Sequence, residues 1–270
     1  MPLIEDAVMN KLLAAGFVLA LALPACALAQ SSLNGTWKTD VSSMKGSGKP
    51  VVISLKDGVY ANNAHPPIKV KADGEDHAVT GHPGFDTIAV AVVNDHSFKE
   101  TEKKAGKVVT TGTFSVAPDG KSGTYQFTDT SGAAPVTGKL MVQRVAKGVP
   151  GSNAAAGTWK FGHYGDISAS ALTATYKIDG DTVSFSDPTG DSYTANINGK
   201  AVPFKQGSGV TGTTVSVERD GHNGLRETYY RNGKKTGVDV IEVAADGHSA
   251  KFTNHDLESG RTMVAVADKQ

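Results

Sequence analysis

The chain has 270 residues, and its 27 lysine and arginine residues balance its 27 aspartate and glutamate residues. This length allows one or two domains with hydrophobic cores. The balanced charge and the lack of a basic cluster argue against nucleic acid as a partner. A single cysteine, Cys26, excludes a disulfide within the chain and a thiolate metal site.

The N-terminal residues have the pattern of an export signal. Lys11 precedes the apolar run 12–23, which is followed by the small-residue sequence ALA. This order is typical of a secretory signal peptide, so we expect residues 1–29 to be removed and the protein to be periplasmic or secreted. The run is too short for a membrane span of about 20 residues. Alternatively, the sequence LPAC forms a lipobox that anchors Cys26 to lipid, which also implies export.

Two parts of the chain repeat each other. The sequence GTWK occurs at 35–38 and at 157–160 and contains both tryptophans of the protein. Residues 98–122 also resemble residues 225–249, with a constant offset of 127 (225 minus 98). A repeat of this length predicts two similar units. We place them at residues 32–146 and 157–270, joined by a linker at 147–156 that is rich in Gly, Ala and Ser.

Within each unit, short alternating stretches are separated by tight-turn sequences. Asp179-Gly180, Asn198-Gly199 and Asn232-Gly233 are the clearest of these turns, because both dipeptides supply the positive φ angles of two-residue hairpins. Turns at this spacing favour an all-β sandwich or barrel. We therefore predict an all-β protein of two tandem antiparallel up-and-down β-barrels with about eight to ten strands each, since a closed barrel leaves no unpaired edge.

The sequence Gly-Thr-Trp at the start of each unit resembles the signature of the lipocalin and avidin group of barrels. That resemblance implies that each tryptophan packs across the closed end of a barrel. The alternative is a tryptophan in the core of a β-sandwich. The order LNGTWK, ADGEDHAVTGHPGFDT and KKAGKVVTTGTFSVAPDGKS also resembles an uncharacterised family of small exported β-rich proteins of soil bacteria. This second resemblance implies export and a β-fold, and no active site.

Motifs for catalysis or for metal binding are missing from the sequence. No histidine pair has the spacing of a helical zinc site, and no G-x-S-x-G nucleophile motif occurs. We therefore expect a protein that is not an enzyme and has no metal and no cofactor.

The best candidates for a binding site are two acids at equivalent places in the repeat. If Phe98 and Leu225 point inward, the period of two in a strand turns Glu100 and Glu227 inward too. A buried carboxylate needs a partner, so each acid contacts a ligand or belongs to a structural ion pair. Alternatively, both lie in solvent near a strand end or pair across the strand with a lysine. Tyrosines of the second unit suit a cavity that is apolar yet offers hydrogen bonds. The candidate ligand-binding residues are Glu227, Tyr229, Tyr176, Tyr193 and Glu100.

These observations predict a non-catalytic binding protein for a small, partly apolar molecule, because barrels of this size can hold one ligand. An alternative is a structural or adaptor protein of the cell envelope whose barrels are filled by side chains. A third hypothesis is an enzyme that uses Glu227 or Glu100 for acid–base chemistry. We expect neither nucleic acid nor a membrane span among its interactions.

Overall fold

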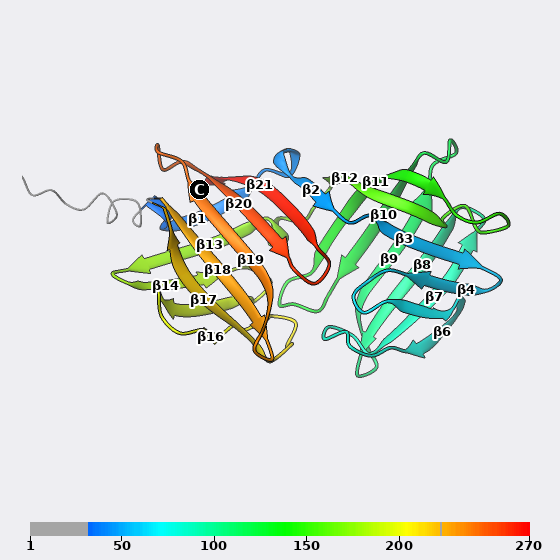
Figure 1. Ribbon diagram of the computed structural model, residues 1–270, viewed down its shortest axis with the longest axis horizontal. Coiled ribbons are helices and arrows are strands. Elements are labelled where there is room, and N and C mark those ends of the chain that lie inside the picture. Colours follow the sequence, from blue (N-terminus) through cyan, green and yellow to red (C-terminus); the bar gives the residue numbers. More distant parts are fainter. Residues whose placement is uncertain (1–31, 222) are drawn as a thin grey trace, which may run out of the picture.

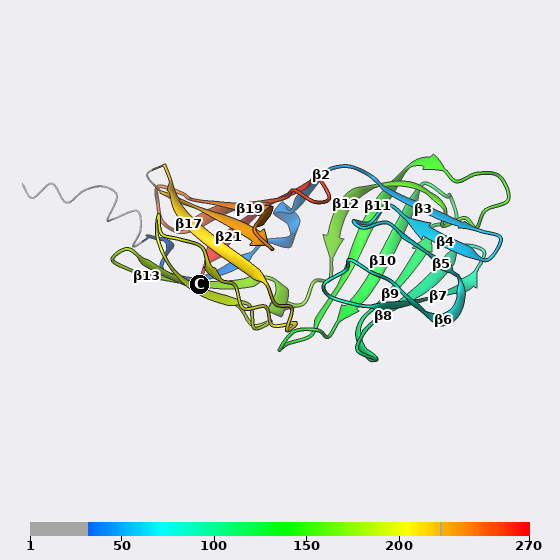
Figure 2. The same cartoon turned by 60° about the horizontal axis from the view of Figure 1, so that its bottom comes forward.

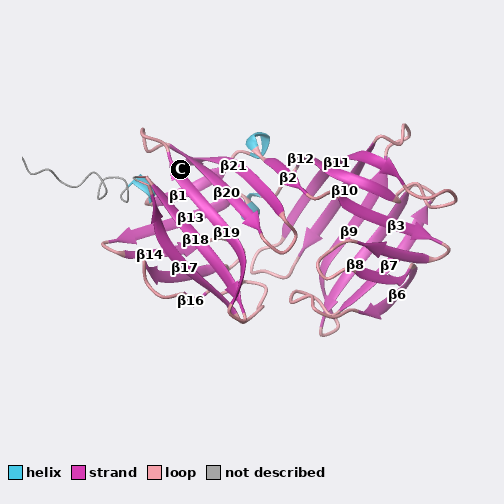
Figure 3. Cartoon of the chain, viewed as in Figure 1, coloured by secondary structure: helices cyan, strands magenta, loops and turns pink. Residues whose placement is uncertain are grey.

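A computed structural model of the protein describes residues 32–221 and 223–270. The expected signal segment 1–29 and Cys26 lie outside these residues. The described chain is nearly all strand and loop (Figure 3). It forms two antiparallel β-barrels of ten strands each that lie side by side (Figure 1). The predicted fold class, all-β with two up-and-down barrels, is therefore confirmed.

The first barrel, here called the continuous barrel, uses one uninterrupted stretch of chain. Its strands pair in sequence order, except that β5 and β6 lie side by side without a ladder and β12 pairs back with β3. The strands are β3 (Val51–Lys56), β4 (Val59–Asn62), β5 (Ile68–Lys71), β6 (Asp73–Ala78), β7 (Thr87–Asn94), β8 (Ser97–Lys104), β9 (Lys107–Val116), β10 (Ser122–Asp129), β11 (Val136–Lys147) and β12 (Gly157–Gly165).

The second barrel, here called the split barrel, combines the start and the end of the described chain. Strand β1 lies between β13 and β21, and the short strand β2 adds to the other part of β21. Besides β2 (Lys45–Gly48), which lies off the barrel path, its ten strands are β1 (Gly35–Thr39), β13 (Thr173–Asp179), β14 (Thr182–Ser186), β15 (Ser192–Asn196), β16 (Val202–Pro203), β17 (Thr213–Asp220), β18 (Gly224–Arg231), β19 (Lys234–Val243), β20 (Ser249–Asp256) and β21 (Arg261–Lys269). Two short 3₁₀ helices, η1 (Val41–Ser43) and η2 (Ala169–Ala171), follow β1 and precede β13.

The strand pairing differs from the division that the sequence repeat predicts. Each GTWK strand joins the barrel built by the other half: β1 completes the split barrel, and β12 completes the continuous one. Consequently the linker expected at residues 147–156 contains the end of β11 and, at residues 148–156, the loop of the β11–β12 hairpin inside one barrel. The chain crosses between barrels at residues 40–50 and 166–172, and the first crossing includes β2 (Figure 1, Figure 2). The sequence could not reveal this exchange, because the two candidate first strands begin with the same four residues.

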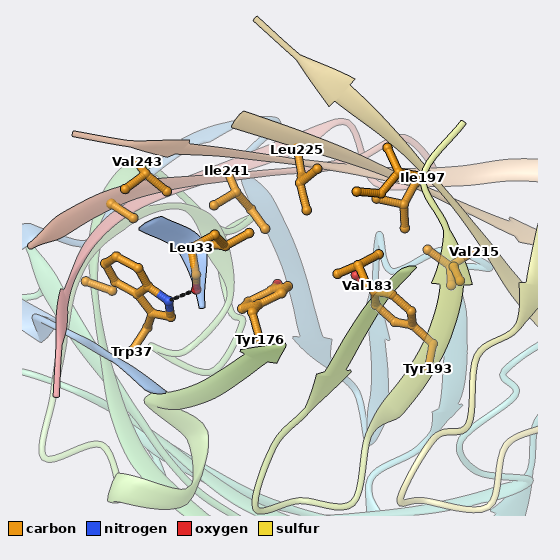
Figure 4. Close-up of a cluster of buried hydrophobic side chains, with 14 residues drawn as sticks. Leu33, Trp37, Tyr176, Val183, Tyr193, Ile197, Val215, Leu225, Ile241 and Val243 are labelled. Carbon is orange, nitrogen blue, oxygen red and sulfur yellow. Dashed lines mark hydrogen bonds between the residues drawn. The ribbon is translucent and has the colours of Figure 1, made fainter. Parts of the chain in front are cut away.

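Each barrel has its own core, and each core contains one tryptophan. Trp37 packs in the split barrel with Leu33 and Tyr176 (Figure 4), and Trp159 packs in the continuous barrel. Each indole N–H donates to the carbonyl four residues earlier, Leu33 at 2.8 Å and Ala155 at 3.1 Å. The two indoles are therefore held in the same way although they lie in separate barrels.

Candidate functional site

The predicted acid Glu227 lies inside the split barrel. Leu225 on β18 is 2% exposed and fixes which face of the strand points inward, so Glu227 two residues later points inward as well. Its exposure is only 1%. The alternative of a solvent-exposed acid is thus excluded for this residue.

Three tyrosine hydroxyls surround the carboxylate of Glu227. Tyr229 donates to Oε2 at 2.7 Å, Tyr193 donates to Oε1, and Tyr176 adds a third hydrogen bond. The tyrosines come from β18, β15 and β13, so the fold gathers four of the five predicted residues around one point. Hydroxyl donors take the place of the water that the buried carboxylate has lost.

A second acid, Asp239, joins this cluster. It lies directly opposite Glu227 in the β18–β19 ladder and accepts a hydrogen bond of 2.6 Å from the amide of Asn254 on β20. Burial, with a contribution from the neighbouring Asp239, raises the pKa of Glu227 to about 7. Burial likewise raises the pKa of Asp239 to about 6. The sequence analysis missed Asp239, although its place two residues before the buried Ile241 is a signal for an inward position.

Glu100, the fifth predicted residue, lies in the continuous barrel and not with the other four. Phe98 on β8 is 1% exposed and turns Glu100 inward, where the Tyr125 hydroxyl donates to it at 3.2 Å. Tyr60 bonds the same carboxylate and itself accepts from Asn62 at 2.9 Å. Burial raises the pKa of Glu100. Both barrels therefore hold an inward acid next to tyrosine hydroxyls. These tyrosines come from β4 and β10 in the continuous barrel, and from β13, β15 and β18 in the split barrel.

A cavity of about 420 Å³, here called the junction cavity, lies where the two barrels meet. Strand β12 pairs with β3 only as far as Trp159. Strand β2 pairs with β21 of the split barrel and does not extend the β3–β12 ladder. The junction cavity lies between β12 and the β2–β21 pair. Its apolar and aromatic wall consists of Leu140, Val142, Trp159, Phe161, Tyr164 and Met263.

The other side of the junction cavity is polar. Lys49, Asn254, Asp256 and Arg261 line it. The carboxylate of Asp256 accepts from the Ser259 hydroxyl at 2.5 Å and from two backbone N–H groups of the β20–β21 turn. Although burial opposes ionisation, these hydrogen bonds hold the pKa of Asp256 below its usual value. One side of the cavity therefore has two cations, Lys49 and Arg261, and an acid, Asp256, whose oxygens already accept hydrogen bonds. The other side is apolar.

Asn254 connects the cavity to the acid cluster of the split barrel. It lines the cavity and also bonds Asp239, which faces Glu227 across the ladder. Neither the junction cavity nor a larger cavity of about 480 Å³ beside the β11–β12 loop is lined by Glu227 or its three tyrosines. Four of the predicted residues thus form a cluster that is connected to the cavity wall through Asp239 and Asn254.

Comparisons with known proteins do not assign the chain to a family: no family description matches its sequence, and no curated protein does either. Residues 32–221 and 223–270 contain no helix long and apolar enough to cross a membrane. In the same residues, no group of three or more His, Cys, Asp or Glu side chains is arranged to hold a metal ion.

Proposed function

We propose that the protein binds a small, partly apolar molecule in the junction cavity without changing it chemically. One observation carries this proposal: aromatic and aliphatic side chains of β11, β12 and β21 form a wall around about 420 Å³. Sites for small molecules are typically concave, mostly apolar and about 300–1,000 Å³ in volume, with a few polar groups that orient the ligand.

The polar groups of the cavity favour binding over catalysis. Asp256 is the acid in the lining, and hydrogen bonds from its own turn already occupy both of its oxygens. Glu227 is enclosed by tyrosines behind the wall. A general base must reach the proton that it removes. Glu227 does not line the cavity, and the hydrogen bonds of Asp256 hold its carboxylate in its own turn.

Export remains part of the proposal. The N-terminal signal pattern supports a periplasmic or secreted protein, whose cavity binds a molecule present outside the cytoplasm. The alternative function, a structural or adaptor protein of the cell envelope, predicts a cavity that binds nothing.

The two tryptophans allow a direct test of binding. In Trp37→Phe the only remaining indole is Trp159, which lines the cavity, so titration with decanol or decanoate is expected to change its fluorescence and to saturate. In Trp159→Phe the remaining indole is Trp37, in the core of the other barrel, and its emission should stay constant. If Trp159 responds to neither probe, the binding proposal is wrong and the structural alternative gains support.

Two further variants locate the site. Leu140→Phe narrows the cavity and should weaken binding, whereas Val145→Phe changes a residue of the same strand that is 56% exposed and does not line the cavity. Glu227→Gln tests whether the acid cluster takes part. Weaker binding by that variant would support the sequence-based prediction that Glu227 takes part in ligand binding, with Asn254 as its connection to the cavity.

A further inference from the structure

We infer that the ligand of the junction cavity is an amphipathic organic anion, with its apolar part against Trp159 and Phe161 and its carboxylate or sulfonate beside Arg261 and Lys49. This inference rests on the proposed function and adds the chemical class of the ligand.

The charges that line the cavity are the first argument. Three cations, Lys49, Lys160 and Arg261, face one acid, Asp256. That acid accepts hydrogen bonds from donors of its own turn, which favour its ionised form, as does the charge of Arg261. Among the residues that the structure describes, neither Lys49 nor Arg261 forms an ion pair. Asp256, which lies opposite Arg261 in the β20–β21 ladder, is the one acid in this lining, so the cavity carries an excess of positive charge.

The pairing of β2 with β21 brings the two cations to the same edge. Gly48 lies opposite Arg261 in this ladder, at a φ of 111°. A Cβ atom on Gly48 would come within 2.5 Å of the Gly260 carbonyl oxygen and 2.9 Å of the Arg261 Cα. Because Gly48 has no side chain, the end of β2 can lie this close to Gly260 and Arg261. Lys49 comes next, and a Cβ atom on Gly260 would lie 3.7 Å from the Cε atom of its side chain.

Arg261 also lies close enough to the aromatic wall for its charge to affect the pKa of Tyr164. Burial raises the pKa of Tyr164, and the charge of Arg261 opposes that shift. The rings of Tyr164 and Phe161 meet edge to face at 5.3 Å, so the cation is near one end of a continuous aromatic surface. A guanidinium binds a carboxylate or sulfonate through two parallel hydrogen bonds, while the rings receive an acyl or aryl group. Both parts of one small anion are thereby accommodated.

A pair of probes that differ in the head group tests the inference. With Trp37→Phe as the reporter protein, decanoate should bind roughly tenfold more tightly than decanol, the difference expected for one charge-assisted hydrogen bond. Adding Arg261→Gln should remove that preference by weakening decanoate and leaving decanol unchanged. Lys49→Gln should act in the same direction. Lys45→Gln is the matched control, because Lys45 is exposed at the start of β2, the strand that precedes Lys49, and does not line the cavity.

The outcomes separate the inference from the proposed function. Equal affinities for the two probes, with no effect of Arg261→Gln, would overturn the anionic ligand and leave apolar binding in place. Binding of neither probe would overturn both. Thermal unfolding of each variant checks the fold, which we expect to be unaffected because the Arg261 side chain is exposed.

Discussion

The guanidinium of Arg144 lies over the indole of Trp159, with its carbon atom 4.0 Å from the ring centroid. The same guanidinium donates to three backbone carbonyls: Gly120 at 2.6 Å, Ala156 at 2.7 Å and Ala154 at 2.5 Å. One side chain of β11 therefore fastens the β9–β10 turn and the β11–β12 loop to the tryptophan at this end of the continuous barrel.

Arg144→Lys is expected to destabilise the protein by about 2–4 kcal/mol, because an ammonium cannot reproduce three divergent hydrogen bonds and the stacking on the ring. Urea unfolding measures the change. Lysine does occupy the corresponding place in the split barrel, where Lys269 Nζ lies 5.4 Å from the Trp37 ring centroid and makes one bond to a backbone carbonyl. Arg219→Lys, in an exposed ion pair with Asp181, is the control and should cost less than about 1 kcal/mol. Similar costs for both variants would contradict the role given to Arg144.

The glycines that begin the two GTWK sequences should differ in their tolerance of alanine. Both have a positive φ, 134° at Gly35 and 151° at Gly157, which costs a non-glycine residue about 1–3 kcal/mol. A Cβ on Gly157 would also lie 2.6 Å from the Ala146 carbonyl oxygen, whereas on Gly35 its nearest contact is the flexible end of Lys269 at 2.8 Å. Gly157→Ala should therefore lower the free energy of unfolding more than Gly35→Ala does. Gly84→Ala, with no atom within 4 Å of the new Cβ, should be nearly neutral, and the reverse order would refute this account.

The exchanged strands predict which piece of the chain folds alone. A fragment of residues 50–166 contains all ten strands of the continuous barrel, including β12 and Trp159. A fragment of residues 32–146, the first unit of the sequence repeat, lacks β12 and leaves β3 and β11 with unpaired edges. We expect cooperative thermal unfolding and dispersed amide NMR signals from the first fragment only. If the second fragment is the folded one, the exchange of β1 and β12 does not occur in solution.

Local features of the sequence predicted the strands and the inward acids, because hairpin turns and strand alternation depend on neighbouring residues. Asn232-Gly233 does connect β18 to β19, and Phe98 and Leu225 do fix the faces of their strands. The junction cavity could not be predicted in this way. Phe161 and Arg261 are a hundred residues apart in the sequence. They line the same cavity only because β2 pairs with β21 of the split barrel while β12 belongs to the continuous barrel.

The tyrosines around the two acids illustrate the same limit. Glu100 and Glu227 occupy equivalent strands, β8 and β18, yet their hydroxyl donors come from different strands of the two barrels. A pattern along one strand gives the direction of the acid. Its partners lie across the barrel, at positions that depend on strand tilt and on closure.

The buried Glu227 and the half-buried Asp239 should make stability depend on pH. The pKa of Glu227 is raised from 4.5 to about 7 in the folded protein, mainly by burial, and that of Asp239 from 3.8 to about 6. At a pH between the unfolded and the folded pKa of each acid, the unfolded chain has released a proton that the folded chain retains. The free energy of unfolding therefore falls as pH rises through this range, and it levels off above the folded pKa values. Protonated carboxyl groups are thus the form that the barrel interior favours.

Glu227→Gln should remove the share of that dependence that comes from Glu227 and leave the share that comes from Asp239. Glutamine keeps the shape of the protonated acid and has no proton to lose, so the variant should be less sensitive to pH between 5 and 7, where the shift of Glu227 corresponds to about 3 kcal/mol. Urea unfolding at a series of pH values, on wild type and variant, measures the difference. Glu218→Gln, an exposed residue on the adjacent strand β17, is the control and should follow the wild-type curve. A wild-type stability that stays constant from pH 5 to 7, or one that rises, would show that Glu227 is ionised in the folded barrel, and its tyrosine hydroxyls would then outweigh the cost of its burial.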